Sequence, residues 1–405
     1  MTQAPHPTVP GTLVTVAVLL LASLTIMSNA TIAPSLPGLR AHFANVAGID
    51  TLAGLLLTLP SAAIMLTAGL IGWLADRVNR QWLLLGAAVA VAVGGASGLV
   101  AETLPQMLAG RIVLGVGVAG TMTLALTWGA DLWQGPARAR YLGMQGATMS
   151  AGGVLVMLLG GALASLHWRG AFAAYLVVVP VAAVALHALA PNVRARTARG
   201  RLASGRVEGQ FPWRAFALVG PLAFIFMLTF YIMPTRMPFL LSDMGLSNPA
   251  LIGAAMALLT LVSIPGALFY GRLRRHVSAM AVFAGSFGFM GAGLLLVGLS
   301  SGLPGVIAGI VLTGIGMGPS IPNYSTYFMG FVPPGMRGRA SGLLTTAFFA
   351  GQFASPLASA PLVAAFGTQG AFEAMGVTLV ALCAVLGAVA SRARAPRASQ
   401  SVAGE

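Results

Sequence analysis

The sequence contains no lysine, one cysteine and only eight acidic residues among its 405 positions. Without a lysine it has no G-x-x-x-x-G-K-[ST] loop, which excludes the direct use of ATP through that motif. The single cysteine, Cys383, cannot form an intramolecular disulfide. Charged residues make up only 7% of the chain, whereas soluble domains carry about 25%, so the composition excludes a soluble globular protein.

Hydrophobic residues make up 57% of the chain. Apolar stretches of about 20 residues recur along nearly its whole length, and a helix of that length crosses a bilayer. We predict helices, because the strands of a membrane barrel would be half as long and alternating. Pro319 and Pro322 are expected to interrupt span ten. The twelve predicted spans are Leu13–Pro34, Thr51–Gly72, Trp82–Ala101, Gln106–Gly129, Tyr141–Leu166, Ala171–Ala190, Ala215–Met237, Pro249–Gly271, Ala279–Leu299, Val306–Gly330, Ala340–Ala365 and Ala371–Ala390.

All 22 basic residues are arginines, and their positions indicate the orientation of the chain. Arg111 and Arg236 fall inside spans, only Arg40 and Arg169 fall in the loops opposite the N-terminus, and the other 18 lie on the side of the N-terminus. Short arginine-rich loops stay in the cytoplasm. We therefore predict a multi-pass protein of the cell membrane, with a bacterial inner membrane favoured and both termini cytoplasmic. The net charge of +14 follows from this topology, and no nucleic-acid partner is expected.

The second half of the chain repeats the first with a constant shift of 199 positions. Because each copy has six spans, both enter the membrane in the same orientation, as in a parallel repeat about the membrane normal. We therefore divide the chain into a first six-helix bundle (1–190), a cytoplasmic linker (191–213), a second six-helix bundle (214–391) and a cytoplasmic tail (392–405). The matching pairs include Gly86 and Gly285, Gly94 and Gly293, Leu104 and Leu303, Gly115 and Gly314, and Gly117 and Gly316.

Gly115, Gly117 and Gly120 have the G-x-G-x-x-G spacing of a dinucleotide-binding loop. That loop needs a strand before it and an acid about 20 residues later, but this run lies inside a span, and the next acid, Asp131, is too near. The run returns in span ten, so we interpret these glycines as small residues that let helices pack closely. Neither a cofactor nor a metal site is expected.

The segment GWLADRVNRQ between spans two and three carries a recognisable motif. With its two six-span halves and the basic loop between them, the whole chain resembles the major facilitator superfamily of secondary transporters. The resemblance implies an all-α membrane protein with 12 transmembrane helices in two six-helix bundles, which rock about a central site. The residues that match the family motif G-x-L-a-D-r-x-G-r-r are Gly72, Leu74, Ala75, Asp76, Arg77 and Arg80, with Asn79 in the glycine position and Gln81 in place of a basic residue.

Span one, with LTIMSNATIAPSLP, and Arg111 in span four resemble the drug and metabolite efflux branch of that family, the 12-span drug:H+ antiporters. Arg111 to Gly115 follow its R-x-x-q-G pattern, with Leu114 replacing the glutamine. Of the antiporter pattern G-x-x-x-G-P-x-x-G-G in span five, only the final Gly160 and Gly161 are present. The resemblance implies efflux, including multidrug resistance, while the incomplete pattern weakens the inference of antiport.

The motif also predicts a cytoplasmic gate, made of Gly72, Asp76, Arg77, Arg80 and Asp131. As an anion, Asp76 would be stabilised near the N-terminus of span eleven, around Ala340 and Ser341. Arg77 and Arg80 would pair with Asp131 in a charge cluster that exists only when the inner side is closed. The alternative is a solvated loop whose charges only set the topology.

Arg111 is the strongest single candidate for cargo binding, because an arginine at bilayer depth costs about 2.5 to 3.5 kcal/mol unless it faces water, a partner or a ligand. The resemblance places spans one, four, seven and ten around the central cavity, where Asn29, Arg111 and Arg236 would meet. The alternatives are that Arg111 bonds nearby carbonyls without touching cargo and that Arg236 snorkels outward. Further polar candidates, each equally consistent with a helix–helix hydrogen bond, are Tyr231, Asn323, Tyr324, Tyr327 and Gln352.

No acidic residue lies in the middle of spans one, four, seven or ten. The cavity field is therefore expected to be positive, which favours an anionic, zwitterionic or neutral amphipathic cargo held by charge-assisted hydrogen bonds. The candidates for proton coupling lie at the outer membrane edge, where Glu373 is accompanied by Glu102 and His167. Proton antiport, anion exchange and facilitated diffusion all stay open.

We predict a secondary active transporter, not an enzyme, that exports a small organic solute by alternating access, as a monomer surrounded by membrane lipid. One alternative is an uptake carrier or exchanger for an organic anion. Another is a membrane enzyme or lipid-handling protein, which would need clustered catalytic groups, whereas the five histidines are scattered over both sides. A channel is disfavoured because no ring of filter residues is repeated.

Overall fold

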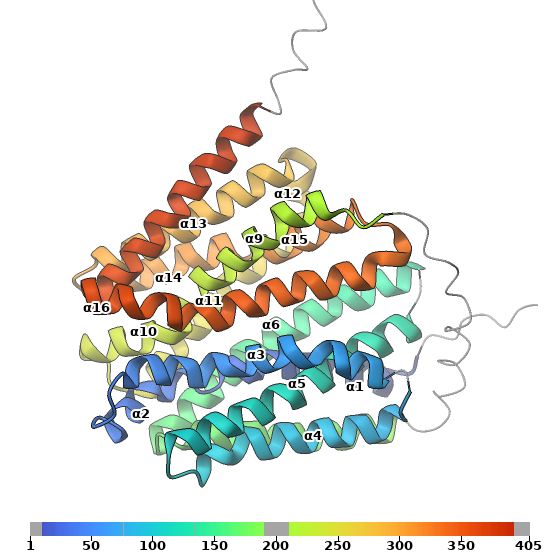
Figure 1. Ribbon diagram of the computed structural model, residues 1–405, viewed down its shortest axis with the longest axis horizontal. Coiled ribbons are helices and arrows are strands. Elements are labelled where there is room, and N and C mark those ends of the chain that lie inside the picture. The colour runs from blue at the N-terminus through green and yellow to red at the C-terminus, as the bar shows by residue number, and fades with distance from the viewer. Residues whose placement is uncertain (1–9, 76, 134, 190–209, 393–405) are drawn as a thin grey trace, which may run out of the picture.

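The computed structural model describes residues 10–75, 77–133, 135–189 and 210–392, and this part of the chain contains helices and no strand (Figure 1). Most of the predicted linker and tail lies outside the described residues. The first half comprises α1 (Thr12–Ala30), η1 (Ala33–Ser35), α2 (Leu36–His42), α3 (Ile49–Ala75), α4 (Arg80–Ala96), η2 (Ser97–Leu99), α5 (Leu104–Leu132), α6 (Gly135–Leu166), η3 (Gly170–Val177) and α7 (Val178–Ala188). The second half comprises α9 (Trp213–Phe230), α10 (Ile232–Asp243), α11 (Pro249–Leu268), α12 (Tyr270–His276), α13 (Ala279–Leu299), α14 (Leu303–Met317), α15 (Ser320–Met329), η6 (Pro334–Met336) and α16 (Arg337–Arg392).

Eleven helical segments of the described residues are long and apolar enough to cross a membrane. The longest, α16, is interrupted at Gly367, whose φ of 73° and ψ of 177° are not helical. Glycine adopts a positive φ without a steric penalty, so the chain turns there and α16 makes two crossings. The resulting twelve crossings confirm the predicted all-α membrane fold, and the break lies between predicted spans eleven and twelve.

Several crossings are interrupted near their middle. α14 ends at Met317 and α15 begins at Ser320, on either side of Pro319. Proline has no N–H for the helical ladder, so the predicted interruption of span ten is confirmed at Pro319, whereas Pro322 lies in the first turn of α15 and does not break it. α9 and α10 likewise meet at Tyr231. In membrane proteins such breaks are tolerated where the freed backbone groups face protein or a water-filled cavity.

Close helix contacts at glycines are built alike in the two halves. A Cβ on Gly94 would lie 2.7 Å from the carbonyl oxygen of Gly110, and one on Gly293 would lie 2.6 Å from that of Gly309. Both pairs join consecutive crossings, α4 to α5 and α13 to α14. The shift of 199 is therefore visible in the packing as well as in the sequence. The same shift relates the backbone neighbours of Gly115 and Gly314, which are Pro60 and Leu259, and those of Gly117 and Gly316, which are Val91 and Met290.

The crossings give the molecule two ends. We call the end at the starts of α1 and α9 the terminal end, and the end at the α2–α3 and α10–α11 connections the far end. In Figure 1 the first half of the chain lies below the second half, and the far end is on the left.

The two halves touch near the far end and part towards the terminal end. A Cβ on Gly54 in α3 would lie 2.9 Å from Pro356 Cβ in α16. Gly72 and Gly338 lie 18 residues closer to the terminal end on the same faces of these helices, about 27 Å away. A Cβ on either would have no atom of the other helix within 4 Å. The halves therefore diverge towards the right of Figure 1.

α6 and α11 contact each other in the same way. A Cβ on Gly161 would lie 2.9 Å from the carbonyl oxygen of Pro249, and one on Gly153 would lie 3.8 Å from Thr260 Cγ2. Gly146 is seven residues closer to the terminal end, on the same face of α6 as Gly153. A Cβ on Gly146 would meet no atom of another helix within 4 Å. Both pairs of helices thus join the halves near the far end.

We expect Gly94→Val to destabilise the first bundle, because its side chain would overlap the backbone of Leu114 and Gly110. Overpacking of this kind costs about 1–3 kcal/mol, which lowers the melting temperature of the purified protein by several degrees. Gly86→Val, on the same helix, meets no atom within 4 Å and is the control. Equal melting temperatures for the two variants would contradict the packing of α4 on α5.

Candidate functional site

The candidate site lies where α3, α10 and α16 meet, around Gly54, Thr235 and Pro356. A Cβ on Gly54 would lie 2.9 Å from Pro356 Cβ and 3.7 Å from Thr235 Cβ. We call this region the seam, because it joins the two halves of the chain. Three of the predicted cargo residues, Tyr231, Arg236 and Gln352, come from the second-half helices that form it.

Arg236 is buried in the seam, with 2% of its surface exposed. Its Nε donates a hydrogen bond to Ser359 Oγ at 3.0 Å, and its Nη2 donates to the carbonyl oxygen of Pro356 at 3.4 Å. Asp50, on α3 of the other half, lies close enough to interact with its charge. Arg236 therefore does not snorkel to the surface and brings a positive charge between the two halves.

Buried polar groups without a hydrogen bond occur on the helices of the seam. Gln352, one turn before Pro356 on α16, has 4% of its surface exposed, and its Nε2 makes no hydrogen bond. The hydroxyls of Ser355 on α16 and Ser61 on α3 are also buried without a partner. A buried polar group without a partner costs about 1–3 kcal/mol, so this part of the seam has hydrogen-bonding capacity that the chain itself does not use.

Tyr231 stands at the junction of α9 and α10. Its side chain packs against the hydrophobic cores of both halves, and its ring lies 5.5 Å from that of Phe230, edge to face. Phe349 of α16 also packs against the core of the first half. Tyr231 and Phe349 therefore add aromatic surface from the second half where the two halves meet.

Arg111 lies within the first half, away from the seam, and none of its surface is exposed. Its Nη1 donates to Tyr175 Oη at 3.0 Å and its Nη2 to the carbonyl oxygen of Gly95 at 3.0 Å. Tyr175 in turn donates to the carbonyl oxygen of Ser28 at 3.1 Å. The rings of Phe172 and Tyr175 lie 4.8 and 4.9 Å from the guanidinium carbon. This geometry corresponds to the alternative in which Arg111 bonds neighbouring groups of its own bundle.

The polar residues of span ten bond within the second half. Asn323 accepts from Tyr270 Oη at 3.0 Å and donates to the carbonyl oxygen of Ala279 at 3.0 Å. Tyr324 donates to the carbonyl oxygen of Leu222 at 2.8 Å. Tyr327 is half-buried against the rings of Phe283 and Phe331. The bonds of Asn323 and Tyr324 are the helix–helix hydrogen bonds given as the alternative for these residues.

Two further predicted residues contribute less to the geometry. The backbone of Asn29 lies in α1, one residue before that helix ends, but its side chain is outside the described part of the structure. Glu373 lies in the second crossing of α16, where its side chain packs against Gly298 of α13 in the same bundle. Its surroundings are therefore within one half rather than at the seam.

Part of the predicted gate is present at the terminal end. Arg80 Nη1 lies 2.7 Å from Asp131 Oδ2, which confirms that pairing. Arg77 instead stacks on Trp73, with its guanidinium carbon 4.0 Å from the ring centre. Asp76 lies outside the described residues. Arg80 and Asp131 both belong to the first half and pair while Gly72 and Gly338 are apart. That the charge cluster exists only when the inner side is closed stays a prediction.

The sequence analysis did not predict that four charged residues, Arg40, Asp50, Arg236 and Asp243, lie close together at the far end. Arg40 of α2 forms an ion pair with Asp243 of α10, with Nη2 2.5 Å from Oδ1, and its Nε lies 4.0 Å from Asp50 Oδ1. Asp243 is seven residues after Arg236 on α10. The signal in the sequence was that Arg40 is one of only two arginines in the loops of the far end, but its partner lies 203 positions away.

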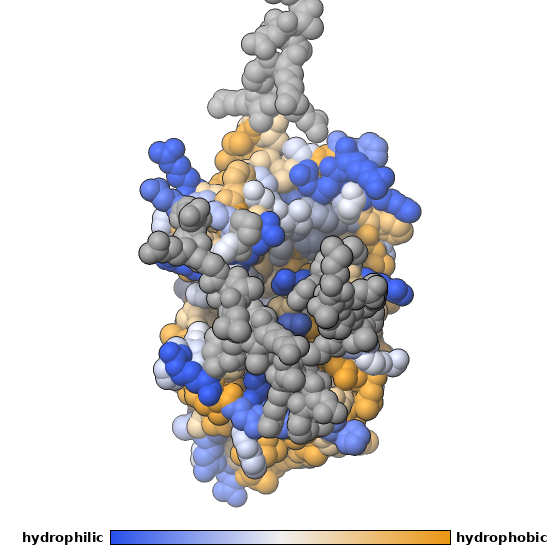
Figure 2. Space-filling model, turned by 90° about the vertical axis from the view of Figure 1, so that its right-hand side faces the viewer, coloured by the Kyte–Doolittle hydropathy of each residue, from blue (hydrophilic) through white to orange (hydrophobic). Residues whose placement is uncertain are grey.

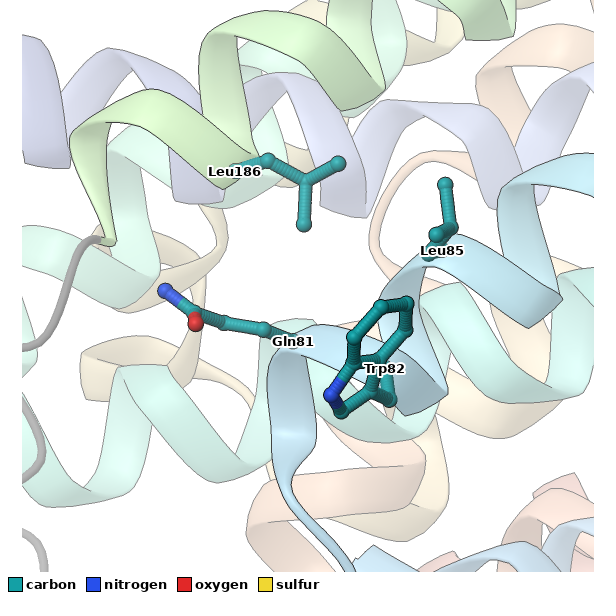
Figure 3. Close-up of a pocket in the computed structure, with 4 residues that line it drawn as sticks. All are labelled: Gln81, Trp82, Leu85 and Leu186. Atoms are coloured by element: carbon teal, nitrogen blue, oxygen red, sulfur yellow. The ribbon is translucent and has the colours of Figure 1, made fainter.

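Hydrophilic side chains gather on the terminal end, which Figure 2 views directly. The exposed arginines there include Arg138, Arg140, Arg272, Arg275 and Arg337. A pocket of about 340 Å³ lies near this end between α4 and α7, lined by Gln81, Trp82, Leu85 and Leu186 (Figure 3). None of the predicted cargo residues lines it. Among the described residues, no cluster of His, Cys, Asp or Glu could hold a metal ion.

The family model described as Major Facilitator Superfamily matches residues 18–356 and 248–405 of the chain. Curated relatives match over shorter stretches. The chain is 31% identical to the class C tetracycline resistance protein of Escherichia coli over 35% of each chain. It is 31% identical to the bacillibactin exporter of Bacillus subtilis (strain 168) over 28% of this chain and 30% of the relative. It is also 27% identical to myo-inositol transporter 2 of Cryptococcus neoformans over 33% of this chain and 25% of the relative. These matches span only 25% to 35% of the length of each relative.

Solved structures match over nearly the whole chain. The crystal structure of the D-xylose-proton symporter aligns with a TM-score of 0.73 and 16% identity, covering 92% of this chain and 96% of that one. The human organic anion transporter MFSD10 aligns with a TM-score of 0.65 and 21% identity, covering 92% of this chain and 98% of that one. At these identities the likeness concerns the fold.

We expect Tyr175→Phe to lower the melting temperature of the purified protein, because it removes the hydroxyl that accepts from Arg111 and donates to Ser28. A buried charged donor would lose its partner, at a cost of about 1–3 kcal/mol. The matched control is Tyr141→Phe, since the Tyr141 hydroxyl is equally buried but has no hydrogen-bond partner. The assignment of Arg111 to this network fails if both substitutions change the melting temperature by the same amount.

Proposed function

The chain belongs to the Major Facilitator Superfamily, and from that membership we propose that it is a secondary carrier that moves a small organic solute across a membrane by alternating access. Carriers of this kind are not enzymes: they expose one central site to one side of the membrane and then to the other. The proposal needs two bundles that can separate at either end without losing their own packing.

The observation that carries the proposal is the one-sided contact between the halves. Gly54 and Pro356 are in contact near the far end, while Gly72 and Gly338 are apart at the terminal end. We assign the terminal end to the cytoplasm, because most of the arginines lie there and arginine-rich loops remain on that side. The described conformation is then the inward-facing state of a multi-pass protein of the cell membrane, a bacterial inner membrane being favoured.

For the cargo site we propose Arg236, Gln352 and Tyr231, together with Asn29. Arg236 supplies positive charge, Gln352 an unused hydrogen-bonding group, and Tyr231 an aromatic surface. Arg111 acts on the cargo through its charge, because its hydrogen-bond partners are neutral groups and leave that charge uncompensated. A site with this chemistry favours an anionic, zwitterionic or neutral amphipathic solute.

Asn323 and Tyr327 come from the other crossing that the family resemblance places at the centre, and we propose that they act indirectly. Asn323 ties α15 to Tyr270 and to the start of α13, so it positions the interrupted crossing rather than the cargo. Tyr327 is half-buried nearby and extends the aromatic surface.

The direction we propose is export by a monomer. Two of the relatives are named as a tetracycline resistance protein and an exporter, and the sequence resembles the efflux branch in spans one and four. Uptake or exchange of an organic anion is the second candidate, which the buried charge of Arg236 favours. Coupling to protons is part of the proposal for export. Glu373 is the weakest candidate for the group that carries the proton, because its carboxylate packs within one bundle.

The orientation and the open side can be tested by cysteine labelling in a Cys383→Ser background. Gly342→Cys is expected to react with a membrane-impermeant maleimide in inside-out vesicles, because Gly342 is exposed and a Cβ there would meet no other helix or side chain within 4 Å. Ser355→Cys, on the same helix, is fully buried and should stay unlabelled in the same state. Labelling of Gly342→Cys in intact cells alone would reverse the orientation, and equally fast labelling at both positions would contradict the inward-facing state.

The cargo site can be tested by counterflow in proteoliposomes with anionic, zwitterionic, neutral and cationic solutes. Arg236→Gln should slow the transport of an anion at least about tenfold, because charge-assisted hydrogen bonds contribute about 1.5–3 kcal/mol, while neutral solutes are affected less. Arg169→Gln, which removes an arginine from a far-end loop, is the control. Equal loss for every class would make Arg236 a structural residue. Absence of counterflow for every class with the unmodified protein would refute the carrier.

A further inference from the structure

The far end carries a set of four charges that is balanced between the two halves. Each half contributes one arginine and one aspartate. In the first half these are Arg40 at the end of α2 and Asp50 at the start of α3, and in the second half they are Arg236 and Asp243 on α10. Arg40 and Asp243 join the halves directly.

Arg40 faces Asp243 and Asp50 with different edges of its guanidinium group. Its Nη1 and Nη2 donate to the two carboxylate oxygens of Asp243, at 3.4 and 2.5 Å. Its Nε points to Asp50 and lies 4.0 Å from Oδ1. The guanidinium carbon also lies 5.0 Å from the centre of the Phe239 ring on α10. In this conformation Arg40 is committed to the opposite half.

Asp50 is an acceptor without a hydrogen bond. Its Oδ1 is buried and makes none, although it is the oxygen nearest to Arg40. A movement of about 1 Å would bring Nε and Oδ1 to hydrogen-bonding distance. Because Arg40 and Asp50 belong to the same half, they would move together when the halves separate, whereas Asp243 would leave with α10.

We propose that Asp50 takes Arg40 over from Asp243 when the far end opens, so that Asp50 is a positioning residue of the transport cycle. The transfer replaces an ion pair between the halves by one within the first half, and it lowers the cost of opening. Asp243 has no such substitute. Arg236 lies seven residues earlier on the same helix, about 10 Å along its axis, so Asp243, already half-exposed, becomes hydrated instead.

This inference rests on the proposed alternating access. It predicts opposite effects for substitutions of Asp50 and Asp243. Both are neighbours of one arginine, yet their removal must act in opposite directions. Asp243→Asn removes the bond that holds the far end closed, so the open form should gain population. Asp50→Asn removes the partner available to Arg40 in the open form, so the closed form should gain population.

The experiment measures the distance between spin labels on Val46→Cys and Ser247→Cys in a Cys383→Ser background, with the full chain in nanodiscs. Both positions are exposed at the far end and lie in different halves. Partly exposed ion pairs are weak, so we expect the ratio of open to closed populations to rise about two- to fivefold in Asp243→Asn and to fall by a similar factor in Asp50→Asn. Arg169→Gln, which removes a far-end charge whose hydrogen bond to the carbonyl oxygen of Leu99 lies within the first half, is the control and should leave the ratio unchanged.

A second comparison identifies the arginine as the shared partner. In an Arg40→Ala background, Asp243→Asn should lose its effect on the ratio and Asp50→Asn should no longer favour the closed form, because Arg40 is no longer there to be exchanged and Asp50 keeps only its interaction with Arg236. Shifts of the two single variants in the same direction, or no shift in Asp50→Asn, would overturn the exchange while leaving alternating access intact. A single far-end distance in every variant would overturn alternating access as well.

Discussion

Close approach of helix backbones at glycine is the constraint on which the rest of this structure depends. Between helices in lipid there is no hydrophobic gain, so packing and hydrogen bonds hold them together. Gly94 lies against Gly110 within one bundle, and Gly54 lies against Pro356 between the bundles. The glycine contacts between the bundles, at Gly54, Gly153 and Gly161, lie towards the far end, whereas a Cβ on Gly146 or Gly338, towards the terminal end, would meet no atom of another helix within 4 Å.

The two buried arginines differ in what surrounds them. Arg111 donates to Tyr175 and to the carbonyl oxygen of Gly95 inside the first bundle, and its Nε is buried without a partner, so its hydrogen bonds do not depend on the arrangement of the two halves. Arg236 bonds Ser359 at the seam and lies near a carboxylate of the opposite half. Its surroundings change when the halves move. A charge in a low-dielectric interior is sensitive to such changes, which is why we propose Arg236 rather than Arg111 for direct contact with the cargo.

Some of the candidate site could be predicted from neighbouring residues, and some could not. The pairing of Arg80 with Asp131 was predictable because both lie where adjacent crossings reach the same end. Its expected dependence on closure stays a prediction, because the local sequence does not say how the two halves move. Arg40 and Asp243 are 203 positions apart, and nothing in their local sequence relates them. Asp50, which faces the Nε edge of the Arg40 guanidinium, looks in the sequence like an ordinary acid at the start of a helix.

The sequence by itself determined the number of crossings, their repeat with a shift of 199 and the interruption at Pro319, because hydropathy, glycine spacing and the missing N–H of proline are properties of short segments. Only the tertiary structure decided which side each polar residue faces. Arg111 turns to Tyr175 and Arg236 to Ser359 although both are single arginines in apolar crossings. The rotation of a helix about its axis is set by the helices packed against it, and these come from distant parts of the chain.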